Sequence, residues 1–145
     1  MARVASHSLA ALLIALALAA CTNDESGPEE SHTPVSAALY IGNLDVSADL
    51  LLEAGETVRV EVRFLDDEGN EITGIEDDHH TALTFTPAAL ATTTSVDGRN
   101  FQKDVTAQGD FGTGTVLVGY GHDEEADELE FGPYPVRVVA TGASR

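Results

Sequence analysis

Cysteine, tryptophan and basic residues are scarce or missing in this chain of 145 residues. The single cysteine, Cys21, excludes an intramolecular disulfide, so a packed core has to stabilise the fold. The chain has 7 lysines and arginines against 25 aspartates and glutamates, a formal net charge of −18. Nucleic acids and anionic lipid headgroups repel such a chain. Its charged partners are therefore expected to be cations or a basic protein surface, and no nucleic acid.

A long membrane-spanning run is also missing, but a shorter apolar run lies near the start of the chain. The run from Leu9 to Ala20 contains no charge and follows a short segment with one basic residue, Arg3. A spanning helix needs roughly 20 apolar residues, so this run is too short to cross a bilayer. Its layout is that of a secretory signal, which predicts export.

The end of the apolar run, Leu18-Ala19-Ala20-Cys21, resembles the lipobox of bacterial lipoproteins. The resemblance implies that the thiol of Cys21 is acylated and that residues 1–20 are removed as a signal peptide. The protein would then be lipid-anchored in the bacterial cell envelope, at the outer membrane or at the extracytoplasmic face of the cell membrane. An ordinary signal peptide is the alternative, because Ala17-Leu18-Ala19 also fits a cleavage site.

The region behind the cysteine changes character twice. Residues 21–34 are polar, acidic and interrupted by prolines, which predicts a flexible, disordered linker behind the lipidated Cys21. Residues 35–140 consist of short apolar runs separated by glycine-containing and acidic turns, and residues 141–145 form a short tail. The sequence therefore predicts one all-β domain on a tether.

The clearest strand of this domain is Thr57–Leu65, in which apolar and charged residues alternate. Such alternation predicts that one face lies in a core and the other in water. Further strands are predicted at 35–41, 49–52, 81–86, 90–95, 101–107, 113–120 and 134–140. Roughly seven short strands in a domain of this size fit a two-sheet sandwich.

Pairs and rows of apolar residues in these strands are expected to face the core. They are Val58, Val60, Val62 and Phe64, then Leu83 and Phe85, then Val116, Val118 and Tyr120, and finally Val136 and Val138. Pro133 and Pro135 are expected at a strand entrance or at a sheet edge, where a missing N–H donor is tolerated. Gly109, Gly112, Gly114, Gly119 and Gly121 lack the spacing of a phosphate loop, which favours turns and close packing.

Residues 49–139 resemble the bacterial Ig-like (Big-type) domains. The resemblance rests on Leu52 to Val58, on the turn from Asp66 to Asn70, and on the glycine-containing stretch from Ala107 to Val118. The closing Pro135-Val136-Arg137-Val138 is similar to the last strand of that family. The chain departs from the family in its middle, where a Trp-containing strand is usual and tryptophan is missing. The resemblance implies an Ig-like sandwich that serves as an adhesive, spacer or ligand-binding module and has no catalytic residues.

Two clusters of acidic residues and histidines are the candidates for chemistry. One is Glu76-Asp77-Asp78-His79-His80, and the other runs from His122 through Asp123 and Glu124 to Glu130. If Thr57–Leu65 is strand B and 113–120 is strand F, the clusters lie on the B–C and F–G loops. These two loops share one end of an Ig-like sandwich. The first strand starts at the same end, so His32 of the linker could reach it as well.

A divalent-metal site is one interpretation of this acidic end. Carboxylates suit Ca²⁺ or Mn²⁺, whereas His79, His80 and His122 with a carboxylate suit Zn²⁺ or Cu²⁺. The candidate ligands are His79, His80, His122, Asp77, Asp78, Asp123 and Glu124. Because neighbouring residues of a strand face opposite sides, His79 and His80 can share a metal only in an irregular loop.

A solvated acidic surface without a bound ion is the alternative interpretation of the same residues. Two functional hypotheses follow for the whole chain. The first is a non-catalytic, lipid-anchored binding or scaffolding module without a cofactor, and the second is a metal-binding envelope protein. A small hydrolase is a third and weaker alternative, because the serines lack the Gly-x-Ser-x-Gly elbow.

Overall fold

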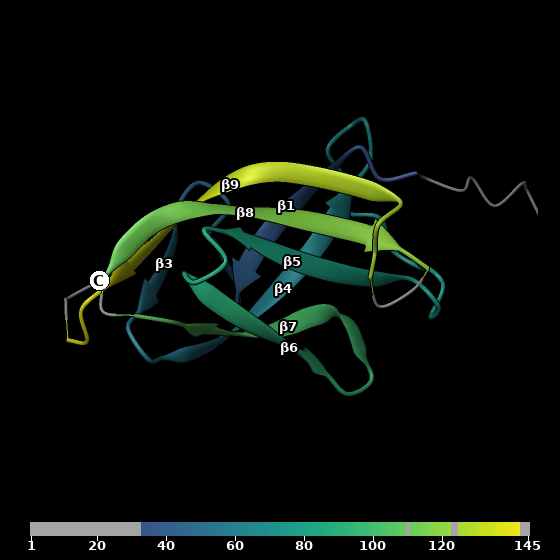
Figure 1. Ribbon diagram of the computed structural model, residues 1–145. Coiled ribbons are helices and arrows are strands. Elements are labelled where there is room, and N and C mark those ends of the chain that lie inside the picture. Colours follow the sequence, from purple (N-terminus) through teal and green to yellow (C-terminus); the bar gives the residue numbers. More distant parts are fainter. Residues whose placement is uncertain (1–32, 110, 123–124, 143–145) are drawn as a thin grey trace, which may run out of the picture. The chain divides into compact units, whose positions relative to one another are not determined.

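The computed structural model describes residues 33–109, 111–122 and 125–142 (Figure 1). The predicted signal peptide, Cys21, His32, Asp123 and Glu124 lie outside these residues. The described part of the chain is folded entirely into strands and loops. Its strands are β1 (Ser36–Ile41), β2 (Leu44–Asp45), β3 (Leu50–Glu53), β4 (Thr57–Leu65), β5 (His80–Thr86), β6 (Ala91–Val96), β7 (Arg99–Ala107), β8 (Gly112–Gly121) and β9 (Leu129–Val139). No helix long and apolar enough to cross a membrane occurs among these residues.

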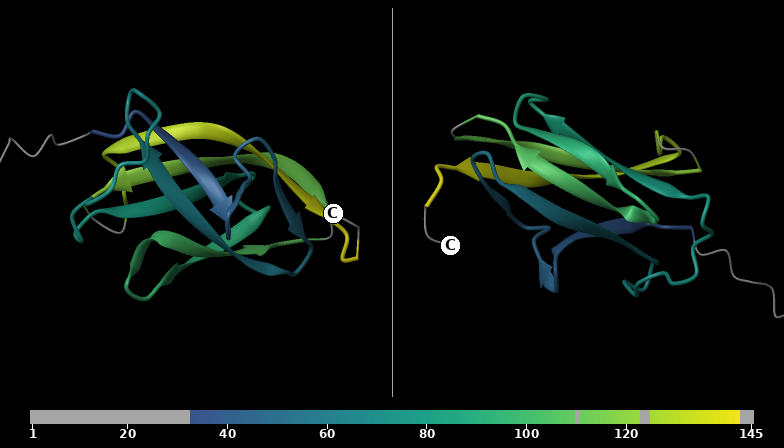
Figure 2. Two further views of the ribbon diagram at one scale, coloured as in Figure 1. Left: turned by 180° about the vertical axis from the view of Figure 1, so that it is seen from behind. Right: turned by 90° about the horizontal axis from the view of Figure 1, so that it is seen from below.

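The strands form two sheets with the order of an Ig-like sandwich. One sheet has the order β2-β1-β4-β7-β6, and the other has the order β3-β9-β8-β5. Figure 1 shows β5, β8 and β9 side by side in front of β1 and β4, and the left view of Figure 2 shows β1 and β4 from the opposite side. In Ig nomenclature, β1, β4, β7 and β6 correspond to strands A, B, E and D of the first sheet. In the second sheet β9, β8 and β5 correspond to strands G, F and C, and the short β3 lies at the edge beside β9. This is the Ig constant-type arrangement, so the predicted fold class is confirmed.

The core fills the space between the two inner faces, and the alternation in β4 explains its composition. Val58, Val60, Val62 and Phe64 of β4 are all buried, as the sequence predicts. They meet the predicted apolar rows of the facing sheet, which are likewise buried: Leu83, Phe85, Val116, Val118, Tyr120, Val136 and Val138. Phe64 lies at the centre of an aromatic group, with ring centroids 4.7 Å from Tyr120 and 5.8 Å from Phe131.

The structure differs from the predicted strands mainly at two places. The two-residue strand β2 was not predicted, because its residues are too few to show a pattern. Strand β9 starts at Leu129, earlier than the predicted 134. Pro133 and Pro135 lie inside β9 and not at a strand entrance, so of the two predicted places for them the sheet edge is the correct one. The parallel partner β3 reaches only from Val136 onwards, so the two prolines occupy a stretch of β9 with a single neighbouring strand.

The ends of the domain extend slightly beyond the predicted limits. Pro34 is already buried, and the N–H of Val35 donates to the carbonyl of Leu65 at 3.0 Å. The chain therefore enters the sandwich beside the loop that follows β4. At the other end, the hydroxyl of Thr141 donates to the carbonyl of Ala54 at 2.9 Å. The first residue of the predicted tail is thus hydrogen-bonded to the residue that follows β3.

Candidate metal centre

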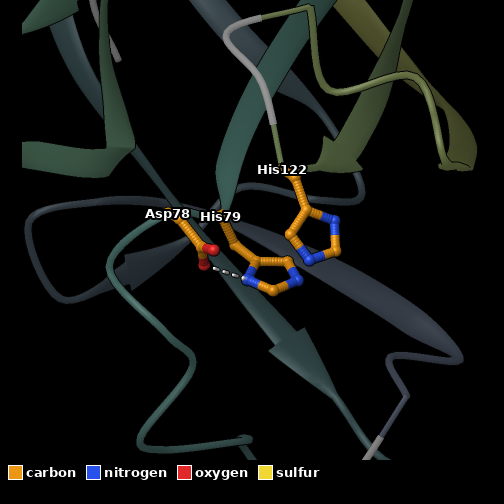
Figure 3. A group of neighbouring side chains, drawn as sticks. All are labelled: Asp78, His79 and His122. Carbon is orange, nitrogen blue, oxygen red and sulfur yellow. Dashed lines mark hydrogen bonds and ion pairs between the residues drawn. The ribbon is translucent and has the colours of Figure 1, made fainter.

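The loops that follow β4 and β8 lie at the same end of the sandwich, as the strand assignment predicts. We call this end the histidine pole and define it by Asp78, His79, His122 and Glu128. One ligand atom from each of Asp78, His79 and His122 lies within 4.8 Å of the others. Figure 3 shows the imidazole ring of His79 between the carboxylate of Asp78 and the ring of His122. The sequence prediction of these three residues as neighbours agrees with the structure.

The register of two paired strands explains why the histidines meet. In the antiparallel ladder of β5 and β8, Thr81 is opposite Tyr120 and His80 is opposite Gly121. One step further along the ladder brings His79 opposite His122. Directly opposed residues of such a ladder have Cβ atoms roughly 5 Å apart. The two rings accordingly have centroids 4.0 Å apart.

Strand alternation separates His79 from His80. Thr81, Leu83 and Phe85 face the core, and His79 continues that row past the start of β5. The ring of His79 stacks on Tyr120 at 4.9 Å between centroids, and its side chain is only 12% exposed. His80 alternates with the core-facing row and lies on the same side of β5 as Ala82 and Thr84, which is the outer face of the sheet. His80 does not join the group.

In each of the two imidazole rings, one nitrogen is hydrogen-bonded to a carboxylate. Nδ1 of His79 is 3.0 Å from Oδ1 of Asp78, and Nδ1 of His122 pairs with Oε1 of Glu128. This hydrogen bond is the main reason why the pKa of His122 is raised and the pKa of Glu128 is lowered. The carboxylates of Asp78 and Glu76 add to the raised pKa of His122. The pole therefore combines two imidazoles with a negative local potential.

Glu128 was not among the predicted ligands, and its place depends on two glycines. Gly119 and Gly121 of β8 lie on the face of the strand opposite to the buried Val118 and Tyr120. The loop before β9 packs against these two glycines. A Cβ on Gly119 would lie 2.3 Å from the carbonyl oxygen of Ala126. The N–H of Glu128 then donates to the carbonyl of Tyr120 at 3.0 Å, which brings the Glu128 carboxylate beside His122. The predicted packing role of these glycines is confirmed.

Asp77 and Glu76 belong to a neighbouring groove instead of the histidine pole. The groove has a volume of about 650 Å³ and lies between the β4–β5 loop and the hairpin of β6 and β7. Its lining carries both signs of charge, since Arg63 is paired with Glu61 at 2.7 Å and with Glu71 at 3.6 Å. The backbone carbonyl of Asp77 accepts a hydrogen bond from the side chain of Asn100. This groove therefore offers both acidic and basic groups to solvent.

The turn after β4 is closed by a carboxylate of its own first residue. Oδ1 of Asp66 accepts the N–H groups of Glu68 and Asn70 at 2.9 and 2.8 Å. This carboxylate closes its own turn, as aspartates at turn starts commonly do. Gly69 completes the turn with a φ of 83°. The residues between Asp66 and Asn70 therefore serve the loop itself.

The strand order defines the chain as an Ig-like β-sandwich protein. No protein-family model and no curated protein sequence matches it. Among solved structures it is similar to domains 4 and 5 of the S-layer protein SbsC, with 20% identity and a TM-score of 0.42. That match covers 74% of this chain and 54% of the other.

Larger fragments of SbsC give comparable matches. Domains 4–9 match at 20% identity and a TM-score of 0.47, over 78% of this chain and 15% of that one. Domains 1–6 match at 23% identity and a TM-score of 0.43, over 76% and 14% of the two chains. This chain thus spans only part of each of these proteins. Likenesses at this level carry no information on what the chain binds.

Proposed function

We propose that this protein is a lipid-anchored module of a bacterial cell envelope, whose Ig-like sandwich binds or spaces other envelope components without catalysing a reaction. The observation that carries the proposal is the cysteine placed directly behind an apolar run of signal length, followed by a single β-sandwich. Acyl chains on Cys21 would hold the protein on a membrane, since each buried CH₂ contributes about 0.8 kcal/mol.

The exposure of the ionisable groups supports a non-catalytic role. The side chains of Asp78 and His122 are 62% and 52% exposed to water. Strong electrostatic catalysis needs preorganised groups in a site that excludes water. The histidine pole is open to solvent instead, which suits binding better than chemistry. With a net charge of −18, a basic protein surface is the partner that electrostatics favours.

Acyl labelling of the full chain in a bacterial host tests the anchor. The unaltered chain should incorporate labelled fatty acid and should start at Cys21, with the acyl mass on its first residue. Cys21→Ser should abolish the label, whereas Ser26→Ala, a matched change in the same segment, should keep it. Cleavage after Ala19 without an acyl group would instead establish the ordinary signal peptide and refute the anchor.

A further inference from the structure

We propose that the histidine pole binds one divalent first-row transition-metal ion of the Zn²⁺ class, held by Asp78, His79 and His122, with Glu128 orienting His122. The site requires neither the lipid anchor nor a partner protein, because all four residues belong to the sandwich. It joins the loop before β5 to the loop after β8.

The distances fit a small tetrahedral ion. Zn²⁺ binds imidazole nitrogen and carboxylate oxygen at 2.0–2.2 Å, so two ligand atoms on one ion are roughly 3.4 Å apart. Oδ1 of Asp78 and Nδ1 of His79 are 3.0 Å apart, and an ion bound to both would take the place of the proton between them. One ligand atom from each of the three residues lies within 4.8 Å of the others. The remaining adjustment is a rotation of exposed side chains. Asp78 and His122 are both more than half exposed, so they can make it.

The chemical nature of the three ligands favours one class of metal ion over another. Ca²⁺ and Mg²⁺ prefer oxygen ligands and fill a coordination shell of six or more. Two imidazoles and one carboxylate favour Zn²⁺, and they also suit Cu²⁺ and Ni²⁺. Three protein ligands leave a fourth position of a tetrahedral ion for water or for a group of a partner.

Each ring already has a partner that restricts it before a metal arrives. His79 is stacked on Tyr120, which is itself packed against Phe64 in the core. His122 has its Nδ1 on Glu128, which leaves the other ring nitrogen for the ion. In such sites a carboxylate commonly accepts a hydrogen bond from the ring nitrogen that does not bind the metal. The pole therefore brings three ligands close together and supplies an outer-shell partner for one of them.

Binding of Zn²⁺ to the full-length protein, purified in detergent, tests the proposal. In about 0.5 M NaCl, where the Debye length is only a few Å, non-specific attraction by the acidic surface is screened. Under these conditions titration calorimetry should give a stoichiometry of one Zn²⁺ per chain. A hundredfold excess over Kd should raise the melting temperature by roughly 10 °C. Ca²⁺ and Mg²⁺ should cause no comparable shift.

Two variants and a matched control locate the site. His122→Ala should weaken Zn²⁺ binding by more than the roughly 10- to 100-fold that loss of an outer-shell partner costs, and Glu128→Gln should fall within that range. His80→Ala removes a histidine one residue from His79 but on the opposite face, so it should bind Zn²⁺ like the unaltered chain. Circular dichroism of each variant without metal verifies that the sandwich is folded.

A spectroscopic measurement detects the coordination of the metal directly, so it does not depend on changes in the stability of the fold. Electron paramagnetic resonance of the Cu²⁺-loaded protein should show two coordinated imidazole nitrogens, and one in His122→Ala. Zn²⁺ affinity that is unchanged in His122→Ala, or reduced equally in His80→Ala, would overturn the assignment. So would equal stabilisation by Ca²⁺, which would leave only a solvated acidic surface.

Discussion

His79 and His122 occupy positions that continue the buried rows of β5 and β8 beyond their last apolar side chain. A hydrophobic residue at either position would extend the core into water. His79 stacks its ring on Tyr120, and His122 places its more exposed ring beside that of His79. The same rule of alternation that builds the core therefore presents the two rings at its open end.

Phe64 has the largest side chain among the fully buried residues of the described core. It is 1% exposed and contacts Phe101, Tyr120 and Phe131. Phe64→Ala should lower the free energy of unfolding by about 3–5 kcal/mol, because it removes buried surface and leaves a cavity. Thr93→Ala, on the exposed part of β6, should change it by less than about 0.5 kcal/mol. Urea unfolding of both variants measures this, and equal effects would refute the assigned core.

The pair of Asp49 and Arg137 predicts a dependence of stability on pH. Arg137 donates from Nε to both carboxylate oxygens of Asp49 at 2.9 and 3.1 Å, and these hydrogen bonds lower the pKa of Asp49. In the unfolded chain an aspartate titrates near about 3.9. The contribution of the pair is thus complete above that pH and is lost as the pH falls through the lower, folded pKa.

Asp49→Asn should reduce the loss of stability on acidification in that range and leave a smaller difference at lower pH. Melting temperatures between about pH 2.5 and 7 measure this. An unchanged pH profile in Asp49→Asn would show that the pair makes no contribution in solution.

Single residues also mark what the sequence could not predict. Lys103 lies in the inward row of β7 with Phe101 and Val105, and it is only 6% exposed. Its Nζ donates to Ser95 at 2.9 Å. A lysine is seldom buried, so alternation alone could not place it on the inner face. Glu128 belongs to the predicted acidic cluster but not to the predicted ligands, since its place beside His122 depends on how a loop packs and not on a pattern.

At the scale of elements, the sequence predicted strands best where alternation was regular. The bounds of β4 agree fully, because four inward apolar residues alternate with outward polar ones. The start of β9 was wrong, because proline normally marks an end. Pro133 and Pro135 are tolerated in a stretch whose free side no strand of the described chain covers. The family-level resemblance stays a prediction, while the sandwich that it implied is confirmed.

The contact between β8 and the loop that precedes β9 yields a prediction on one glycine. Gly119→Ala would place a Cβ 2.3 Å from the carbonyl oxygen of Ala126, so the loop has to move away from the strand. We expect faster hydrogen exchange at the Glu128 amide, which bonds to Tyr120. Gly55→Ala is the control. Its Cβ meets nothing within 4 Å, and it should cost only the roughly 1 kcal/mol of its positive φ without affecting this amide.

The whole domain is expected to fold without the segment that precedes it. Buried residues from both sheets form one core inside residues 33–142. This fragment should show a β-type circular dichroism spectrum and a single cooperative unfolding transition. A fragment that starts at Leu39 would lose Pro34 and the first half of β1, and should be much less stable. If both fragments unfold alike, β1 is not an integral part of the sandwich.

Charge acts on the molecule as a whole. A net charge of −18 on one small chain produces self-repulsion that opposes the compact state. Raising NaCl from about 0.02 to 0.5 M should therefore raise the melting temperature, since salt screens repulsion over distances beyond the Debye length. KCl should act like NaCl if screening is the cause. A melting temperature that falls with salt would mean that the ion pairs outweigh the repulsion.

The parallel pairing of β3 with β9 has a mechanical consequence. The chain enters the sandwich near Leu65 and leaves it beyond Val139, at the opposite end (Figure 1). Tension between residues 33 and 142 would pull β3 towards its start and β9 towards its end. Because the two strands are parallel, this force runs along them and shears their hydrogen bonds together instead of opening them one at a time. When it is pulled between these two ends, the domain should resist up to a high force and then unfold in one abrupt step.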